Sequence, residues 1–174
     1  MLNPPALFAL ALLGFPPGGA AGELTKPPPG MAFIPGGDYK PLYAKDVKPR
    51  PVESFFMDAA QVTNSEFLEF VKRHPEWRRS NVKRTLADSN YLKHWAGDFD
   101  LGAEELRDVP VTNVSWFAAK ACCEANGKRL PTQDEWEFVA RADATRLDAS
   151  GDQAFLRLLL DWYSRPAPGV PPSI

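Results

Sequence analysis

The sequence contains few histidines and cysteines, whose side chains are common ligands of transition metals. It has two histidines, His74 and His94, and two cysteines, Cys122 and Cys123. A metal site built on imidazole would need more histidines, or thiolates and carboxylates at ligand spacing. Adjacent cysteines on a helix point about 100° apart, and a disulfide between them would be strained. We therefore read both cysteines as small apolar residues, and we predict no catalytic, cofactor-binding or metal-binding residue.

The chain also lacks an excess of positive charge. Its formal net charge is -2, whereas nucleic-acid binding normally needs a dense basic face. One basic run surrounds Trp77 and comprises Lys72, Arg73, Arg78, Arg79, Lys83 and Arg84. Such a run fits an acidic partner or a nucleic acid, but it is more often a solvated helix end and loop. We favour the solvated loop and predict no nucleic-acid partner.

A complete set of calcium ligands is missing too. Asp98, Asp100 and Gly102 faintly suggest a calcium loop, but an EF-hand needs a third oxygen ligand before its glycine. We therefore predict no calcium site here.

No hydrophobic run is long enough to span a bilayer. The apolar segment Leu7–Phe15 is followed by the small residues Ala20, Ala21 and Gly22, a pattern typical of an export signal. We predict a signal peptide at residues 1–22 and a periplasmic or secreted protein. The alternative is a disordered or mis-started N-terminus, because the leader has no Lys or Arg at its front.

Proline is abundant, at 18 residues, so much of the chain is expected to be loop. Residues 23–30 form a proline-rich linker and residues 166–174 a proline-rich tail. Between them, residues 31–165 are predicted to form one partial domain, with a short amphipathic helix at Phe155–Tyr163 that presents Phe155, Leu158, Leu159 and Trp162 at helical spacing.

Two short strands and one helix are predicted before residue 80. Met31–Ile34 and Phe55–Met57 read as strands, with a turn at Pro35, Gly36 and Gly37 after the first. Thr63 and Glu66 have the spacing of a capping box. Asn64 and Glu66 are read as cap residues of a helix that buries Phe67, Phe70 and Val71 and ends before Pro75.

The segment from Pro110 to Arg141 predicts a strand, a helix, a tight turn and a second helix. Ser115 is the expected N-cap of the first helix, and Gly127 is placed for a left-handed C-cap. Thr132 and Glu135 form a second capping box. Trp116, Ala119, Cys123 and Asn126 share one side of the first helix, and we place Trp116, Trp136 and Val139 in the core.

These residues resemble the sulfatase-modifying factor family, also called the formylglycine-generating enzyme family. The resemblance covers roughly residues 30–142, the first half of a family domain that is normally much longer. It implies an irregular α+β, C-type-lectin-like fold with short strands and three or four short helices, here incomplete. The matching residues are Met31–Gly37, Phe56–Asp58, Val62–Asn64, Glu66, Phe67, Val111, Val114–Trp116, Cys123, Gly127–Thr132, Glu135–Glu137, Ala140 and Arg141.

The resemblance also implies chemistry for which this sequence lacks the residues. Formylglycine-generating enzymes oxidise a cysteine of a client sulfatase with oxygen, and their copper-binding cysteine pair and structural calcium sites lie in the later half of the domain. Related enzymes that make ergothioneine hold iron through three histidines, more than this sequence contains. In some secreted relatives the cysteine matching Cys123 forms a structural disulfide with a later cysteine. The cofactor is therefore unknown, and the expected calcium and copper sites are absent.

Three hypotheses follow. The first is a non-catalytic accessory or binding module of the cell envelope, with an envelope protein as partner and no membrane span. The second is a truncated, frameshifted or split oxidoreductase of the formylglycine-generating type, whose catalytic half is missing. The third is an unstable fragment without function.

Overall fold

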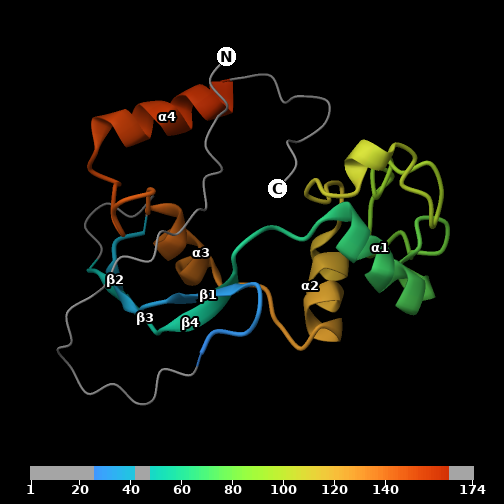
Figure 1. Ribbon diagram of the computed structural model, residues 1–174, viewed down its shortest axis with the longest axis horizontal. Helices are drawn as coiled ribbons and strands as arrows, with labels where there is room; N and C mark the ends of the chain where they lie inside the picture. The colour runs from blue at the N-terminus through green and yellow to red at the C-terminus, as the bar shows by residue number, and fades with distance from the viewer. Residues whose placement is uncertain (1–25, 42–47, 165–174) are drawn as a thin grey trace. The chain divides into compact units, whose positions relative to one another are not determined.

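The computed structural model describes residues 26–41 and 48–164, which form two compact units (Figure 1). Unit 1 contains the described residues up to Ala60 and from Pro131 onward, and unit 2 comprises Gln61–Leu130. The signal peptide and the proline-rich tail predicted above lie outside the described residues, as do residues 23–25 of the predicted linker. Four α-helices and short antiparallel strands confirm the α+β class.

Unit 1 contains two small antiparallel sheets and two helices. Strands β1 (Met31–Ile34) and β4 (Phe55–Asp58) pair with Met31 opposite Asp58. Strands β2 (Gly37–Tyr39) and β3 (Arg50–Val52) pair with Gly37 opposite Val52. The helices are α3 (Gln133–Ala140) and α4 (Gln153–Ser164). Ile34, Tyr39, Val52 and Phe138 form the buried core of this unit.

The predicted strands at 31–34 and 55–57 are confirmed, whereas β2 and β3 were not predicted. The expected turn is narrower than Pro35–Gly37, because Gly37 already begins β2. A Cβ atom on Gly36 would lie 2.5 Å from the carbonyl oxygen of Val52, so only glycine fits where the chain passes from β1 to β2.

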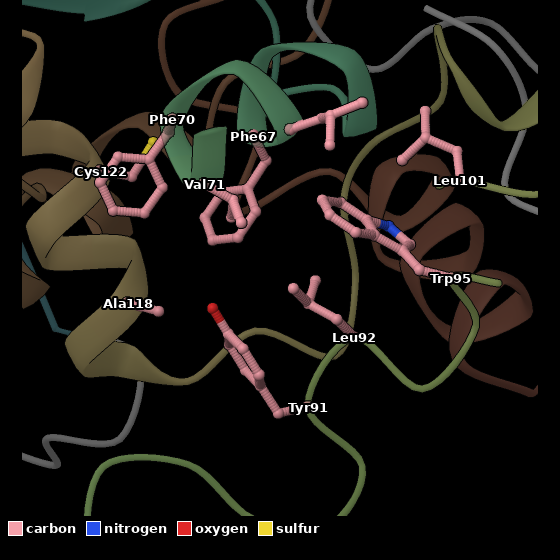
Figure 2. Close-up of a cluster of buried hydrophobic side chains, with 10 residues drawn as sticks. Phe67, Phe70, Val71, Tyr91, Leu92, Trp95, Leu101, Ala118 and Cys122 are labelled. Atoms are coloured by element: carbon pink, nitrogen blue, oxygen red, sulfur yellow. The ribbon is translucent and has the colours of Figure 1, made fainter. Parts of the chain in front are cut away.

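Unit 2 is built on α1 (Asn64–Arg73) and α2 (Trp116–Ala125), which lie side by side in Figure 1. The short 3₁₀ helices η1 (Pro75–Trp77) and η2 (Glu104–Leu106) lie in the long connection between them. Figure 2 shows the core of the unit, where side chains of α1, α2 and the connection converge. Its buried members are Phe67, Leu68, Phe70, Val71, Tyr91, Leu92, Trp95, Leu101, Ala118 and Cys122.

The two predicted capping boxes and the predicted N-cap Ser115 are confirmed. Thr63 and Glu66 form a reciprocal capping box at α1, and Thr132 and Glu135 form one at α3. Ser115 accepts a hydrogen bond from the backbone N–H of Ala118 at the start of α2. The helix α1 ends at Arg73, before Pro75, as its sequence predicts.

The predicted core position of Trp116 is wrong. Trp116 is 62% exposed, because α2 faces α1 with the side that carries the small residues Ala118 and Cys122 rather than with the side that carries Trp116. The expected strand before α2 is also absent; in its place, Pro110 forms a single isolated bridge with Thr63.

The predicted core position of Trp136 is wrong as well. Its side chain is 56% exposed, because Phe138 is the aromatic residue that α3 turns inward, edge to face with Tyr39. Val139 is half-buried against the same core, as expected. In α4, Phe155 is buried but Leu158 is exposed, and the side chain of Trp162 lies outside the described part.

Candidate functional site

The amide of Asn64 is the centre of a buried polar cluster in unit 2. Its Oδ1 accepts a hydrogen bond from Trp95 Nε1 at 2.8 Å and lies 3.1 Å from His94 Nε2. Its Nδ2 donates to the carbonyl oxygens of Val109, at 3.0 Å, and Pro110, at 3.4 Å. All four hydrogen-bonding positions of the amide are used, so Asn64 joins α1 to two separate segments of the connection.

Local structure at the start of α1 holds Asn64 in this position. Thr63 is the N-cap, so Asn64 is the first residue of the helix rather than a cap as predicted. Its backbone N–H donates to Val109 O at 3.0 Å, next to the bridge between Thr63 and Pro110. The capping box with Glu66 orients the helix end, and the bridge brings the carbonyl groups of residues 109 and 110 to the amide.

The protonation state of His94 follows from the orientation of Asn64. Because Oδ1 can only accept, His94 Nε2 must carry a hydrogen and donate it. Nδ1 then remains as the acceptor, and it faces the side-chain nitrogen of Asn113 at 3.5 Å. Burial lowers the pKa of His94 below its usual range, so the ring is neutral at pH 7.

Two residues beside this ring have left-handed backbones. Leu92 has φ 48° and Asn113 has φ 53°, and neither is glycine. The backbone N–H of Leu92 donates to Asn113 O at 2.9 Å. A left-handed backbone is strained for a leucine, and the surroundings must maintain it. Leu92 is fully buried in the core, which anchors the segment on one side.

We call the four side chains Asn64, His94, Trp95 and Asn113 the amide–histidine cluster. The ring nitrogen Nδ1 of His94 is its one basic group. These side chains can bind a proton and hold separate segments together. The sequence did not reveal this cluster, because Asn64 lies 30 residues before His94 and 45 before Val109.

A second polar cluster lies in unit 1 and joins β2, β3 and α3. The hydroxyl of Tyr39 donates to Asp134 Oδ1 at 2.5 Å, and Arg50 Nη1 donates to the same oxygen at 3.2 Å. Burial, reinforced by the hydrogen bond to Asp134, raises the pKa of Tyr39 to about 12. The tyrosine is therefore a neutral donor at ordinary pH.

Arg141, at the end of α3, is the last member of this second cluster. Its guanidinium lies over the ring of Phe138, 4.3 Å from the centroid, and its Nη1 pairs with Asp148 at 3.2 Å. Its Nε is buried and has no hydrogen-bond partner among the described residues. The stacking and the ion pair hold the C-terminal end of α3 against the segment that follows it, so this cluster stabilises the fold.

Cys122 is a core residue, as the sequence predicts. It is buried between α1 and α2, and burial raises the pKa of its thiol to about 11 (Figure 2). The thiolate is the reactive and metal-binding form of cysteine, so this thiol is inert at neutral pH. Cys123 is only half-buried, not buried as expected.

The remaining candidates of the sequence do not gather at one site. His74 stacks on Phe70 and lies 3.6 Å from Glu76, whereas His94 stacks edge-on against Trp95. Within residues 26–41 and 48–164, no three His, Cys, Asp or Glu side chains are arranged to hold a metal ion.

The basic run and the acidic loop serve local structure. Arg79 donates to the carbonyl oxygens of Leu92 and Trp95, at 3.4 and 2.7 Å. Asp98 accepts from the backbone and the hydroxyl of Ser80, at 2.9 and 2.5 Å. Asp100 accepts from the backbone N–H of Gly102 at 2.8 Å. These contacts favour the solvated loop over a ligand site.

The first turn of α2 carries exposed aromatic side chains, a feature that the sequence did not predict. Trp116 and Phe117 stack edge to face in the first turn of α2, with ring centroids 5.4 Å apart, and are 62% and 45% exposed. An exposed aromatic pair is typical of a protein contact surface. Among the described residues, none of the helices is long and apolar enough to cross a membrane.

Comparison with known proteins identifies the relatives of this chain. Residues 19–154 match the family model of the sulfatase-modifying factor enzyme 1-like domain. The formylglycine-generating enzyme of Bos taurus is 29% identical over 161 residues, an alignment that covers 72% of this chain and 43% of the enzyme. The inactive C-alpha-formylglycine-generating enzyme 2 of Bos taurus is 31% identical over 151 residues, covering 64% and 48%.

Relatives with other names share the same region. The serine/threonine-protein kinase pkn1 of Chlamydia pneumoniae is 29% identical over 149 residues, covering 72% of this chain and 22% of the kinase. The chain thus spans less than half the length of the curated relatives that it matches.

Proposed function

The chain belongs to the sulfatase-modifying factor enzyme 1-like domain family, and from this premise we propose that it is a non-catalytic accessory or binding module. We further propose that the module is exported to the cell envelope by residues 1–22. There it would use the C-type-lectin-like scaffold of the family to hold a protein partner.

The state of Cys122 carries this proposal. The oxidation that the family resemblance implies requires a reactive cysteine pair that binds copper, and thiolate is the form that reacts and binds metal. Cys122 instead packs its sulfur in the core of unit 2, where burial raises the pKa of the thiol to about 11. The Cys122 thiol contributes to the packing of the core. The described part of the chain therefore supports a structural role for this cysteine.

The exposed pair Trp116 and Phe117 supports binding to a partner protein. Aromatic side chains dominate the binding energy of protein interfaces, because they bury a large area at a small entropic cost. This pair is rigid, since both residues belong to the first turn of a capped helix.

A second candidate is an oxygen-dependent oxidoreductase of which this chain forms one part. The similarity to the formylglycine-generating enzyme of Bos taurus favours it, because the aligned region covers 43% of that enzyme and the reactive cysteines expected from the resemblance lie elsewhere. The similarity to an inactive relative, over 48% of its length, favours the non-catalytic module equally.

Copper binding and peptide oxidation test whether this chain is an oxidase by itself. The purified full chain is titrated with Cu(I) against a competing chelator, and then incubated with oxygen and a sulfatase peptide that contains the target cysteine. The matched control is the double variant C122S/C123S. We expect the chain to bind no more Cu(I) than the control, and the mass of the peptide to stay unchanged. Cysteine-dependent copper binding with conversion of the peptide would overturn the proposal.

Export is tested separately. The full chain, expressed with residues 1–22 in a bacterial host, is expected in the periplasmic fraction with its N-terminus near Glu23. Recovery of the uncleaved chain from the cytoplasm would contradict export.

A further inference from the structure

We propose that Leu156 and Leu160 of helix α4, which we call the leucine flank, form a dimer interface. On this flank, α4 of a second copy of the chain packs in antiparallel orientation. The proposal goes beyond the proposed function, because it concerns contacts between copies of this chain and not its partner protein. It rests on the position of α4, on the exposure of the two leucines and on the charges beside them.

Helix α4 is fixed at its first turn and along one side. Asp152 Oδ1 accepts hydrogen bonds from the backbone N–H groups of Ala154 and Phe155, at 2.7 and 3.1 Å. Arg146 Nη1 donates to Asp152 Oδ2 at 2.8 Å. Phe155 is buried and Leu159 is half-buried, so this side of the helix is covered. The helix therefore presents its remaining sides to solvent in a fixed orientation.

The leucine flank is an apolar strip on the exposed part of α4. Leu156 and Leu160 are 43% and 68% exposed. Because successive residues of an α-helix are about 100° apart, these two leucines lie one above the other on one side of the helix. Leu158 is also exposed, but it points about 180° away from the middle of the flank. It is therefore an exposed leucine of α4 that does not belong to the strip.

The family resemblance assigns no role to this strip. The match to the family model ends at residue 154, whereas α4 runs from Gln153 to Ser164. Single apolar side chains are common on protein surfaces, but two stacked leucines form a continuous strip that gains free energy when it is covered. The charged residues that border the strip indicate what covers it.

These charges are complementary to those of a second copy. Arg157 and Asp161 are exposed and lie along the same edge of the leucine flank. In an antiparallel pair with a two-fold axis at the level of Leu159, residues 157 and 161 are each two residues from the axis. Arg157 of each copy then lies level with Asp161 of the other copy. The pair of helices thus gains two contacts between opposite charges.

The same arrangement interlocks the leucines. With a rise of about 1.5 Å per residue, Leu160 lies about 1.5 Å and Leu156 about 4.5 Å from the level of the axis. Leucines of the two copies therefore alternate at even spacing along the line of contact, as in packed helix pairs. A parallel pair would place the charged edges of the two copies on opposite sides of this line, so Arg157 would not meet Asp161. The charges therefore favour the antiparallel pair.

Light scattering on the purified full chain tests dimerisation. Size-exclusion chromatography with light scattering is run from about 1 to about 200 μM, because an interface of two short helices is small and gives weak association. We expect the molar mass to rise from that of one chain toward that of two. A mass of one chain throughout would overturn the proposal, and binding of that monomer to neutral lipid vesicles would show that a membrane covers the flank instead. Growth beyond two copies would overturn it as well.

Two matched leucine variants locate the interface. Leu160→Glu places two carboxylates in the middle of the line of contact, so this variant should stay monomeric over the whole range. Leu158→Glu makes the same change on the opposite side of α4 and should dimerise like the original chain. Circular dichroism checks that both variants keep their helices. An equal loss of dimer in both variants, or a loss in neither, would refute the leucine flank.

Charge variants test the antiparallel arrangement without removing a leucine. Asp161→Arg sets arginines of the two copies against each other at both contacts, which should raise the dissociation constant of the dimer about tenfold. The double variant R157D/D161R restores opposite charges at both contacts and should return the dissociation constant to within about threefold of the original value. A double variant that dimerises as weakly as Asp161→Arg would show that the antiparallel arrangement is wrong.

Discussion

Asn64 and Trp95 are joined by a buried hydrogen bond of 2.8 Å from the indole Nε1 to the amide Oδ1, although 31 residues separate them in the sequence. Both side chains are almost completely inaccessible to solvent. The bond ties the first turn of α1 to the middle of the connection that leads to α2. Since the amide also binds residues 109 and 110, one side chain organises most of unit 2.

Replacing this amide should destabilise the unit strongly. Asn64→Ala leaves the indole N–H of Trp95 buried without its partner and removes one of the two hydrogen bonds that Val109 O accepts from residue 64, which costs about 2 to 4 kcal/mol. Urea unfolding followed by tryptophan fluorescence measures the loss. The control Asn90→Ala removes an exposed side chain and should change the stability by less than about 0.5 kcal/mol. Equal stability of the two variants would contradict the role of Asn64.

The two aromatic residues of α3 should respond in opposite ways to truncation. Phe138→Ala empties a position in the core of unit 1 and should cost about 3 kcal/mol or more. Trp136→Ala should cost less than about 1 kcal/mol, because its side chain is largely exposed. Thermal melting of the two variants measures the two losses of stability. A larger loss for Trp136→Ala than for Phe138→Ala would show that Trp136 belongs to the core.

Cys122 should resist alkylation in the folded protein. In a Cys123→Ser background, iodoacetamide at about pH 8 should modify it about 100-fold more slowly than in concentrated urea, because burial both shields the sulfur and disfavours the thiolate. Mass spectrometry over time gives the two rates. Similar rates in the two conditions would show that the thiol is accessible.

Tyr39 should make unit 1 sensitive to alkali. Its pKa is raised from 10.0 to about 12 in the folded state, so its contribution to stability is complete below pH 10 and is lost as the pH rises through about 12. Tyr39→Phe should weaken this loss when denaturant unfolding is measured across that range. Asp134→Asn is the matched variant: it keeps a hydrogen-bond acceptor but removes the charge, which should lower the pKa of Tyr39. An unaltered alkaline profile in both variants would exclude Tyr39 as its source.

Local features of this chain were predictable from the sequence alone. The caps at Thr63, Ser115 and Thr132 were found because each hydroxyl meets a backbone N–H three residues later. Gly127 adopts φ 67° where the sequence suggested a left-handed residue, immediately after Asn126, the C-cap of α2. The positions of the helices follow from such signals, since all the partners lie within one turn.

The inward faces and the polar clusters were decided by tertiary structure. Helical spacing shows which residues of α2 share a face, but not which face meets α1; the small pair Ala118 and Cys122 does so, and Trp116 remains exposed. Asn64 likewise looked like a cap residue, because its partners lie 30 to 46 residues away. Capping is a contact within one turn, so the sequence by itself determined it. Burial and the orientation of a buried amide depend on which distant segments meet, and only the folded chain brings them together.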